Sequence, residues 1–222
     1  QEEEREHLIF DAEIFKDMVK QTSFAASVDE SKGVLVGVLT EIHPQSVSMV
    51  ALDGYRLAVS TEKMNSGQEN HFIISAKIIN EISKIIAEDG DAEEVEIYLG
   101  KKKATFRIDT TEIVLRLMEG EYIKYRDIMP TQSTTDIVIG RAILQESIER
   151  ASLLAREGKN NLIKMTIKNN LLTITSRSEE GNVKEEIIME KEGEDLEIGF
   201  NSKFVIDVLK VIDDDEISMH FL

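Results

Sequence analysis

Residues that could support catalysis or bind a metal are few and scattered in this 222-residue chain, which contains no cysteine. The four histidines are His7, His43, His71 and His220. Their separation along the chain does not match the spacing of zinc ligands, and the lack of cysteine excludes disulfides and thiolate chemistry. We therefore expect no metal site built on histidine or cysteine.

Two further segments carry groups that occur in phosphate-binding or cation-binding sites. Residues 100–104, GKKKA, lack the upstream glycine of a phosphate-binding loop and open a hairpin instead of a helix. Asp89, Asp91 and Glu93 could bind a cation weakly, but they do not follow the EF-hand pattern and are better explained as an acidic turn. A G-x-S-x-G motif is also absent. The sequence therefore predicts a protein that is not an enzyme and needs no cofactor or metal.

The stretch ALDGYRLAVS, residues 51–60, is a more specific signal. Its Asp53-Gly54 pair is typical of a tight hairpin turn, and strand-like runs flank it. The residues that follow, Tyr55–Leu57, are bulky for a plain connector. We predict a turn between two strands, and the three bulky residues make it a candidate binding surface.

The elements that must position this turn belong to a repeat. Four segments each begin with an apolar residue that ends a strand-like run, continue with a small or polar residue suited to a helix N-cap, and then show apolar residues at helical spacing. They are FDAEIFKDMVK (10–20), ISAKIINEISK (74–84), IGRAILQESIE (139–149) and FNSKFVIDVLK (200–210). Their regular separation predicts four equivalent helices, capped by Asp11, Ser75, Gly140 and Asn201.

Strand-like alternation fills the regions between these helices. The predicted strands are 34–42, 46–53, 55–63, 71–74, 94–100, 103–109, 111–118, 162–168, 171–176, 183–189 and 216–222. Each module is thus a helix followed by three strands, with a fourth strand leading into the next helix. Two modules form a natural domain, which predicts an α+β fold with two helices packed on antiparallel sheets in each domain.

The best domain boundary is the aperiodic stretch 119–136, which contains one of the two prolines. We expect domains at 1–128 and 129–222. Only one strand follows the fourth helix, so the second domain is expected to be incomplete at its C-terminal end.

The distribution of charge leaves two interpretations open. The chain has 26 basic and 43 acidic residues and a net charge of −17, which taken globally argues against nucleic acid as a partner. However, the four helical segments, with the third extended to Lys159, are nearly neutral, and acidic clusters at 88–94, 192–195 and 213–216 lie outside them. The helices either carry lysine and glutamate pairs for solubility or share a surface that faces a polyanion without reading its sequence.

Segments that would direct the chain to a membrane are not visible. No apolar run approaches the ~20 residues that span a bilayer, and the N-terminal QEEEREH is not a signal peptide. We therefore expect a cytoplasmic protein with no membrane partner.

The repeat and the stretch 51–60 together resemble the bacterial sliding clamp family, the β subunit of DNA polymerase III. The family pattern is close to A-T-D-G-H-R-L-A, with Leu52 replacing threonine and Tyr55 replacing histidine here. The matching residues are Asp53, Gly54, Arg56, Leu57 and Ala58. Residues 115–130 resemble the family's link between its second and third domains, and 197–209 resemble the start of its last helix.

The resemblance implies a DNA-clamp fold and a non-catalytic processivity factor. A clamp of this family encircles duplex DNA without sequence specificity. It tethers the polymerase III catalytic subunit, the clamp loader and other replication or repair proteins through short linear peptides. The chain resembles the second and most of the third domain, so the homodimeric ring expected of the full-length protein is not expected here. The alternative is an acidic β-rich adaptor that binds peptides and does not encircle DNA.

The resemblance also assigns site residues position by position. The pocket for partner peptides would be formed by Leu35, Leu52, Gly54, Tyr55, Arg56, Leu57, Ile123, Asp127, Ile128, Asn201 and Phe204. Ile123 stands where proline is common and Asp127 where a basic residue can stand. The residues predicted to face DNA are Lys32, Lys77, Arg150 and Lys203, and those at the subunit interface are Leu153 and Leu154.

Overall fold

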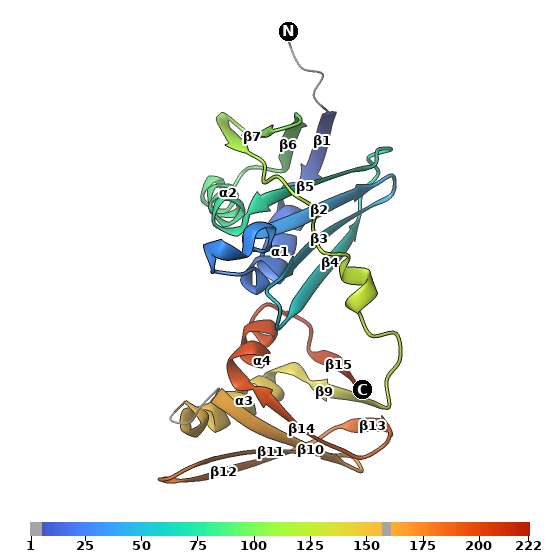
Figure 1. Ribbon diagram of the computed structural model, residues 1–222, viewed down its shortest axis with the longest axis vertical. Helices are drawn as coiled ribbons and strands as arrows, with labels where there is room; N and C mark the ends of the chain where they lie inside the picture. The colour runs from blue at the N-terminus through green and yellow to red at the C-terminus, as the bar shows by residue number, and fades with distance from the viewer. Residues whose placement is uncertain (1–5, 157–160) are drawn as a thin grey trace. The chain divides into compact units, whose positions relative to one another are not determined.

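The computed structural model describes residues 6–156 and 161–222, and the chain divides into two compact units (Figure 1). Unit 1 is Gln1–Tyr125 and unit 2 is Arg126–Leu222. Among the described residues, no helix is long and apolar enough to cross a membrane. Within residues 6–156 and 161–222, each unit contains two α-helices and two antiparallel sheets, so the predicted α+β class is confirmed.

Unit 1 contains two copies of the predicted module. Its elements are β1 (Glu6–Asp11), α1 (Ala12–Thr22), β2 (Gly37–His43), β3 (Ser46–Leu52), β4 (Leu57–Lys63), β5 (Asn70–Ser75), α2 (Ala76–Asp89), β6 (Glu94–Leu99), β7 (Lys103–Ile108) and β8 (Thr111–Arg116), with 3₁₀ turns at Ser23–Ala25 and Glu30–Val36. The sheets have the orders β4-β3-β2-β5 and β1-β6-β7-β8. The strand that leads into each helix therefore joins the sheet of the other module, and this exchange ties the two modules into one body.

Unit 2 repeats the arrangement. Its elements are a 3₁₀ turn at Tyr125–Ile128, which begins one residue before the unit, β9 (Thr135–Gly140), α3 (Arg141–Ala155), β10 (Leu162–Lys168), β11 (Leu171–Ser178), β12 (Gly181–Ile188), β13 (Glu190–Gly193), β14 (Leu196–Asn201), α4 (Ser202–Leu209) and β15 (Glu216–Phe221). The sheets have the orders β12-β11-β10-β14 and β13-β9-β15. The strands leading into α3 and α4 are exchanged in the same way as in unit 1.

The four predicted N-cap residues all occupy the N-cap positions. Asp11 and Asn201 cap with their side chains, which accept hydrogen bonds from the backbone N–H groups of Ile14 and Lys203, each at 3.0 Å. Ser75 and Gly140 make no side-chain cap bond. Within each unit the two helices contact one another, α1 with α2 and α3 with α4.

Three strand predictions need correction. The strand expected from residue 34 begins only at Gly37, because Glu30–Val36 forms 3₁₀ turns around Gly33, whose φ is 60°. The strand expected from residue 55 begins at Leu57, because the loop between β3 and β4 is longer than a two-residue turn. The short strand β13 was missed because its charged sequence, EKEG, has no apolar alternation.

The strands β2 and β3 of the sheet β4-β3-β2-β5 are buried on both faces, whereas the edge strand β4 is largely exposed. Alternate residues of β3 point in opposite directions, and Met49 and Ala51 belong to the main core between the sheets and helices of unit 1. Val50 and Leu52 belong instead to a separate cluster. This second cluster consists of Leu39, Val50, Leu52, Ile73 and Tyr125, with Val34, Leu35, Leu57, Met118 and Tyr122 packed against it.

Candidate binding surfaces

The loop between β3 and β4 is built around the carboxylate of Asp53. The Oδ1 atom of Asp53 accepts hydrogen bonds from the backbone N–H groups of Tyr55 at 3.0 Å and Arg56 at 3.1 Å. The backbone N–H of Asp53 donates to the carbonyl of Arg56 at 3.3 Å. Gly54 has φ 90°, a conformation that a glycine adopts without strain. The predicted turn is therefore confirmed, but it includes Tyr55 and Arg56 as well as Asp53-Gly54.

Arg56 holds this loop in place. Its Nε lies 3.2 Å from Oδ2 of Asp53, one terminal nitrogen donates to the carbonyl of Phe24 at 3.0 Å, and its guanidinium carbon lies 5.4 Å from the centroid of the Phe24 ring. Tyr55 in contrast is 83% exposed. The bulky trio therefore divides by role: Arg56 fixes the loop, Tyr55 is displayed, and Leu57 packs on the second cluster.

The predicted pocket residues of unit 1 come together. Leu35, Leu52 and Leu57 all belong to the second cluster or pack against it, although they come from the 3₁₀ turns, β3 and β4. Gly54, Tyr55 and Arg56 form the loop that joins Leu52 to Leu57. These residues form one apolar wall, in which Leu52 is only 3% exposed, Leu35 and Leu57 are partly exposed and Tyr55 is exposed at the edge.

A segment after β8, which we call the strap (residues 117–125), lies on the second cluster. In Figure 1 it is the yellow-green segment that passes over the sheet β4-β3-β2-β5. Tyr122 packs against the cluster and its hydroxyl donates to the carbonyl of Val50 at 3.5 Å, while burial raises the pKa of Tyr122 to about 12. Tyr125 is only 4% exposed and its hydroxyl bonds to the carboxylate of Glu41.

The two strap tyrosines and Glu41 were not predicted from the sequence. The available signal was the presence of two tyrosines three residues apart in an aperiodic segment of a chain with only four tyrosines. Ile123, the predicted pocket residue between them, is 42% exposed.

The remaining predicted pocket residues lie in unit 2. Asp127 and Ile128 are exposed in the 3₁₀ turn that ends at Ile128. Asn201 is the N-cap of α4 and Phe204, in the first turn of that helix, is partly buried. Their contribution to the same peptide site as the residues of unit 1 stays a prediction.

Two of the residues predicted to face DNA are already paired with carboxylates. Nζ of Lys77 lies 3.5 Å from Glu30, and Arg150 donates two bonds to the carboxylate of Glu185 at 2.7 and 3.1 Å. That pairing raises the pKa of Arg150 and lowers the pKa of Glu185. Lys203 is exposed in the first turn of α4.

Lys32 is exposed beside an acidic neighbour. The pKa of Asp29 is lowered chiefly by hydrogen bonds from Ser31, with a smaller contribution from the charge of Lys32. Lys159, which the sequence analysis counted with the third helix, lies outside the described residues.

The predicted subunit-interface residues lie on α3. Leu153 is 61% exposed and Leu154 is partly buried. Leu153 lines a shallow depression of about 360 Å³ shared by α3 and α4. The other residues lining it are Glu146, Glu149, Arg150, Arg156, Ile206 and Lys210.

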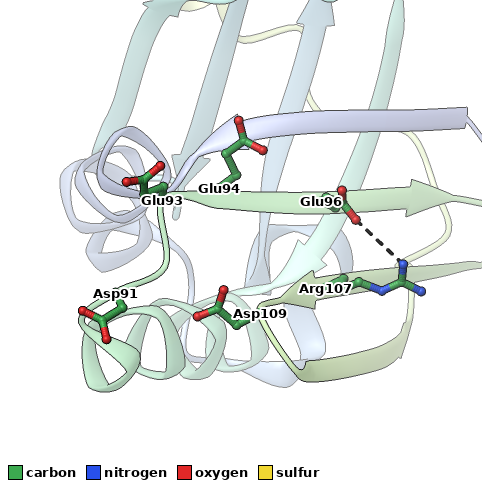
Figure 2. A pocket seen from close by; sticks show the side chains of 6 residues that line it. All are labelled: Asp91, Glu93, Glu94, Glu96, Arg107 and Asp109. Carbon is green, nitrogen blue, oxygen red and sulfur yellow. Dashed lines mark ion pairs between the residues drawn. The ribbon is translucent and has the colours of Figure 1, made fainter.

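An acidic hollow of about 490 Å³ lies at one end of the sheet β1-β6-β7-β8 (Figure 2). It is lined by Asp91, Glu93, Glu94, Glu96, Arg107 and Asp109. Arg107 pairs with Glu96 at 3.9 Å and with Glu112 at 3.1 Å. Within the described part of the chain, no three acidic or histidine side chains lie close enough together to hold a metal ion.

Two units that each contain a duplicated helix-plus-strands module, with exchanged strands and a contacting pair of helices, define the DNA-clamp fold. Sequence comparison gives the same class. The family description "DNA polymerase III beta subunit, central domain" matches residues 10–124, and "DNA polymerase III beta subunit, C-terminal domain" matches residues 126–222. The chain belongs to the DNA polymerase III beta subunit family.

Individual relatives agree with this assignment. The beta sliding clamp of Staphylococcus epidermidis is 37% identical over 211 residues, which is 94% of this chain and 55% of the relative. The crystal structure of the DNA polymerase sliding clamp from Bacillus subtilis is 33% identical, with a TM-score of 0.93 over 100% of this chain and 59% of that one. The chain from Eubacterium rectale, described as a DNA polymerase III beta subunit, gives a TM-score of 0.94 at 32% identity, covering 100% of this chain and 61% of that one. The chain thus spans about half the length of the curated relatives it matches.

Proposed function

We propose that the chain is part of a sliding clamp, a non-catalytic processivity factor that encircles duplex DNA and tethers a DNA polymerase to it. The observation that carries this proposal is the match of the two units, in chain order, to the central and C-terminal domains of the family. The site of action would be the cytoplasm, where bacterial DNA is replicated.

Partner proteins would bind through short linear peptides on unit 1. The partly exposed Leu35 and Leu57 would supply apolar contacts, with Leu52 buried as their support, and Tyr55 adds an aromatic ring that is 83% exposed at the edge of this wall. The partners would be the polymerase III catalytic subunit, the clamp loader and other replication or repair proteins. Asp127, Ile128, Asn201 and Phe204 of unit 2 would complete the pocket.

The helices would bind DNA weakly and without recognising its base sequence. Lys77 and Arg150 stay charged, but each forms an ion pair with Glu30 or Glu185 that has little net charge, which suits a surface on which DNA must slide. Phosphate groups would compete with these carboxylates for the two cations.

The ring itself would require more than this chain. Leu153 and Leu154 would form one side of the subunit contact, and the chain spans only 55% of the length of its first relatives. We therefore expect sedimentation of the 222-residue chain to show no closed ring-shaped dimer. A stable dimer of that shape would contradict this assignment.

The peptide proposal is tested by fluorescence anisotropy with a labelled peptide from the clamp-binding region of a polymerase III catalytic subunit. The chain should bind the peptide, and Tyr55→Ser should weaken binding, because it removes an exposed ring without disturbing the core. The matched control is Val114→Ser, which changes an exposed apolar residue on β8 of the other sheet and should leave binding unchanged. Equal losses in both variants, or no binding by the parent chain, would refute the peptide site.

The DNA proposal is tested with two short labelled duplexes of unrelated sequence at low salt. Both should bind weakly with equal affinity, and Glu185→Gln should tighten binding, since it removes the carboxylate that pairs with Arg150. Each cation that gains a phosphate should steepen the dependence of log affinity on log salt by about 0.9. Peptide binding without any DNA binding would favour the adaptor over the clamp.

A further inference from the structure

The strap is fixed to unit 1 in two different ways. At its start, backbone bonds hold it: Leu117 N–H donates to Lys102 at 2.8 Å and Met118 N–H donates to Ile73 at 2.9 Å. Further along, the side chains of Tyr122 and Tyr125 hold it on the second cluster. The position of the second half of the strap therefore depends on two tyrosine side chains.

The exposed Ile123 lies between these two anchors. Tyr122 directly precedes it, and a tight turn connects it to the second anchor because Tyr125 N–H donates to the carbonyl of Ile123 at 2.7 Å. The backbone at Ile123 is therefore held on one side by the partly buried Tyr122 and on the other by the buried Tyr125. The position of the Ile123 backbone thus depends on the anchoring of these two tyrosines.

The bond between Tyr125 and Glu41 is the polar part of this anchor. The Tyr125 hydroxyl donates to a carboxylate of β2, and a hydrogen bond to a charged acceptor is about twice as strong as a neutral one. Tyr125 is itself a member of the cluster that contains Leu52, so the same side chain links the strap to the apolar wall of the proposed peptide site.

We propose that Tyr125 and Glu41 are positioning residues of the peptide-binding surface. Their bond latches the strap over the buried Leu52, and the latched strap holds the exposed Ile123 in the position that receives a peptide. The inference rests on the proposed function, because it concerns the same surface. Neither residue needs to touch the peptide for its loss to weaken binding.

The test compares Tyr125→Phe with the parent chain, using the same labelled polymerase peptide. The variant keeps the buried ring and removes the hydroxyl, and it should lower peptide affinity about three- to tenfold. Glu41→Gln should produce a smaller loss, because its amide oxygen can still accept a neutral hydrogen bond from the Tyr125 hydroxyl. The two changes together should cost less than the sum of both, because both act on the same bond. The matched control is Tyr98→Phe, whose hydroxyl donates to Glu96 at 3.3 Å on the other sheet of unit 1 and which should leave affinity unchanged.

A second measurement reports on the strap without any peptide. The chain has no cysteine, so Ile123→Cys accepts a single spin label. Adding Tyr125→Phe should make this label more mobile, and adding Tyr98→Phe should not.

Unchanged label mobility in the Tyr125→Phe background, or unchanged peptide affinity, would overturn the inference. Failure of the parent chain to bind the peptide would instead refute the proposed function, and the positioning role would fall with it.

Discussion

Replacing Asp53 tests the account of the loop that displays Tyr55. The Asp53 side chain is 14% exposed, and its two oxygens receive two backbone N–H groups and the Nε of Arg56. Asp53→Ala removes all three bonds and leaves the Arg56 side chain, also mostly buried, without this carboxylate. At about 1 kcal/mol for each bond, we expect the free energy of unfolding of unit 1 to fall by about 3 kcal/mol.

Asp53→Asn separates the contribution of the two backbone hydrogen bonds from that of the ion pair with Arg56. The amide oxygen can still accept from the N–H groups of Tyr55 and Arg56, but the charge that pairs with the guanidinium is lost. We expect a loss of about 1 kcal/mol, clearly smaller than that of the alanine variant.

Urea denaturation followed by tyrosine fluorescence measures both variants. The chain has no tryptophan, and all four tyrosines, Tyr55, Tyr98, Tyr122 and Tyr125, lie in unit 1, so the signal reports on that unit alone. Asp91→Ala, which changes an exposed carboxylate of the same unit, is the control and should leave the transition in place. Equal losses in the alanine and asparagine variants, or losses no larger than that of the control, would refute the role given to the Asp53 oxygens.

Three further predictions concern other parts of the chain. Gly37→Ala should destabilise unit 1 by about 1–3 kcal/mol in the same urea assay, because a Cβ there would lie 2.5 Å from the nearest side-chain atom. Gly181→Ala, in open space in unit 2, should leave the stability of that unit unchanged in urea denaturation followed by circular dichroism. Reversing Lys77 and Arg150 together to glutamate should weaken retention on DNA, most at low salt, and an unchanged salt dependence of binding would contradict their assignment. Asp136→Asn should lower the melting temperature of unit 2 at neutral pH, measured by circular dichroism. Hydroxyl and imidazole partners lower the pKa of Asp136 from 3.8, so the folded state gains stability from its ionised form. The difference from the parent should shrink as the pH falls below 3.8 and disappear below the folded pKa, and a difference independent of pH would contradict this reasoning.

The periodic elements of the fold could be predicted from the sequence. Apolar spacing and capping residues identified all four helices and their N-caps, because these signals act within one or two turns of the chain. Strand β10 was predicted with both of its ends, since turn residues bound it and alternation is strict. Segments without such local signals were mispredicted, such as the 3₁₀ turns at Glu30–Val36 and the charged strand β13.

The candidate site likewise has features that local sequence predicts and features that only the tertiary structure determines. The sequence ALDGYRLAVS alone predicted a turn at Asp53-Gly54, because a turn depends on a few neighbouring residues. It also marked this turn as a candidate binding surface. Only the tertiary structure decided that Arg56 fixes this turn to Phe24 while Tyr55 is displayed, and that the strap covers Leu52 through Tyr125 and Glu41. These pairs are 32 and 84 residues apart in the chain. Contacts at such separations depend on how the sheets bring distant segments together, and no local pattern in the sequence records them.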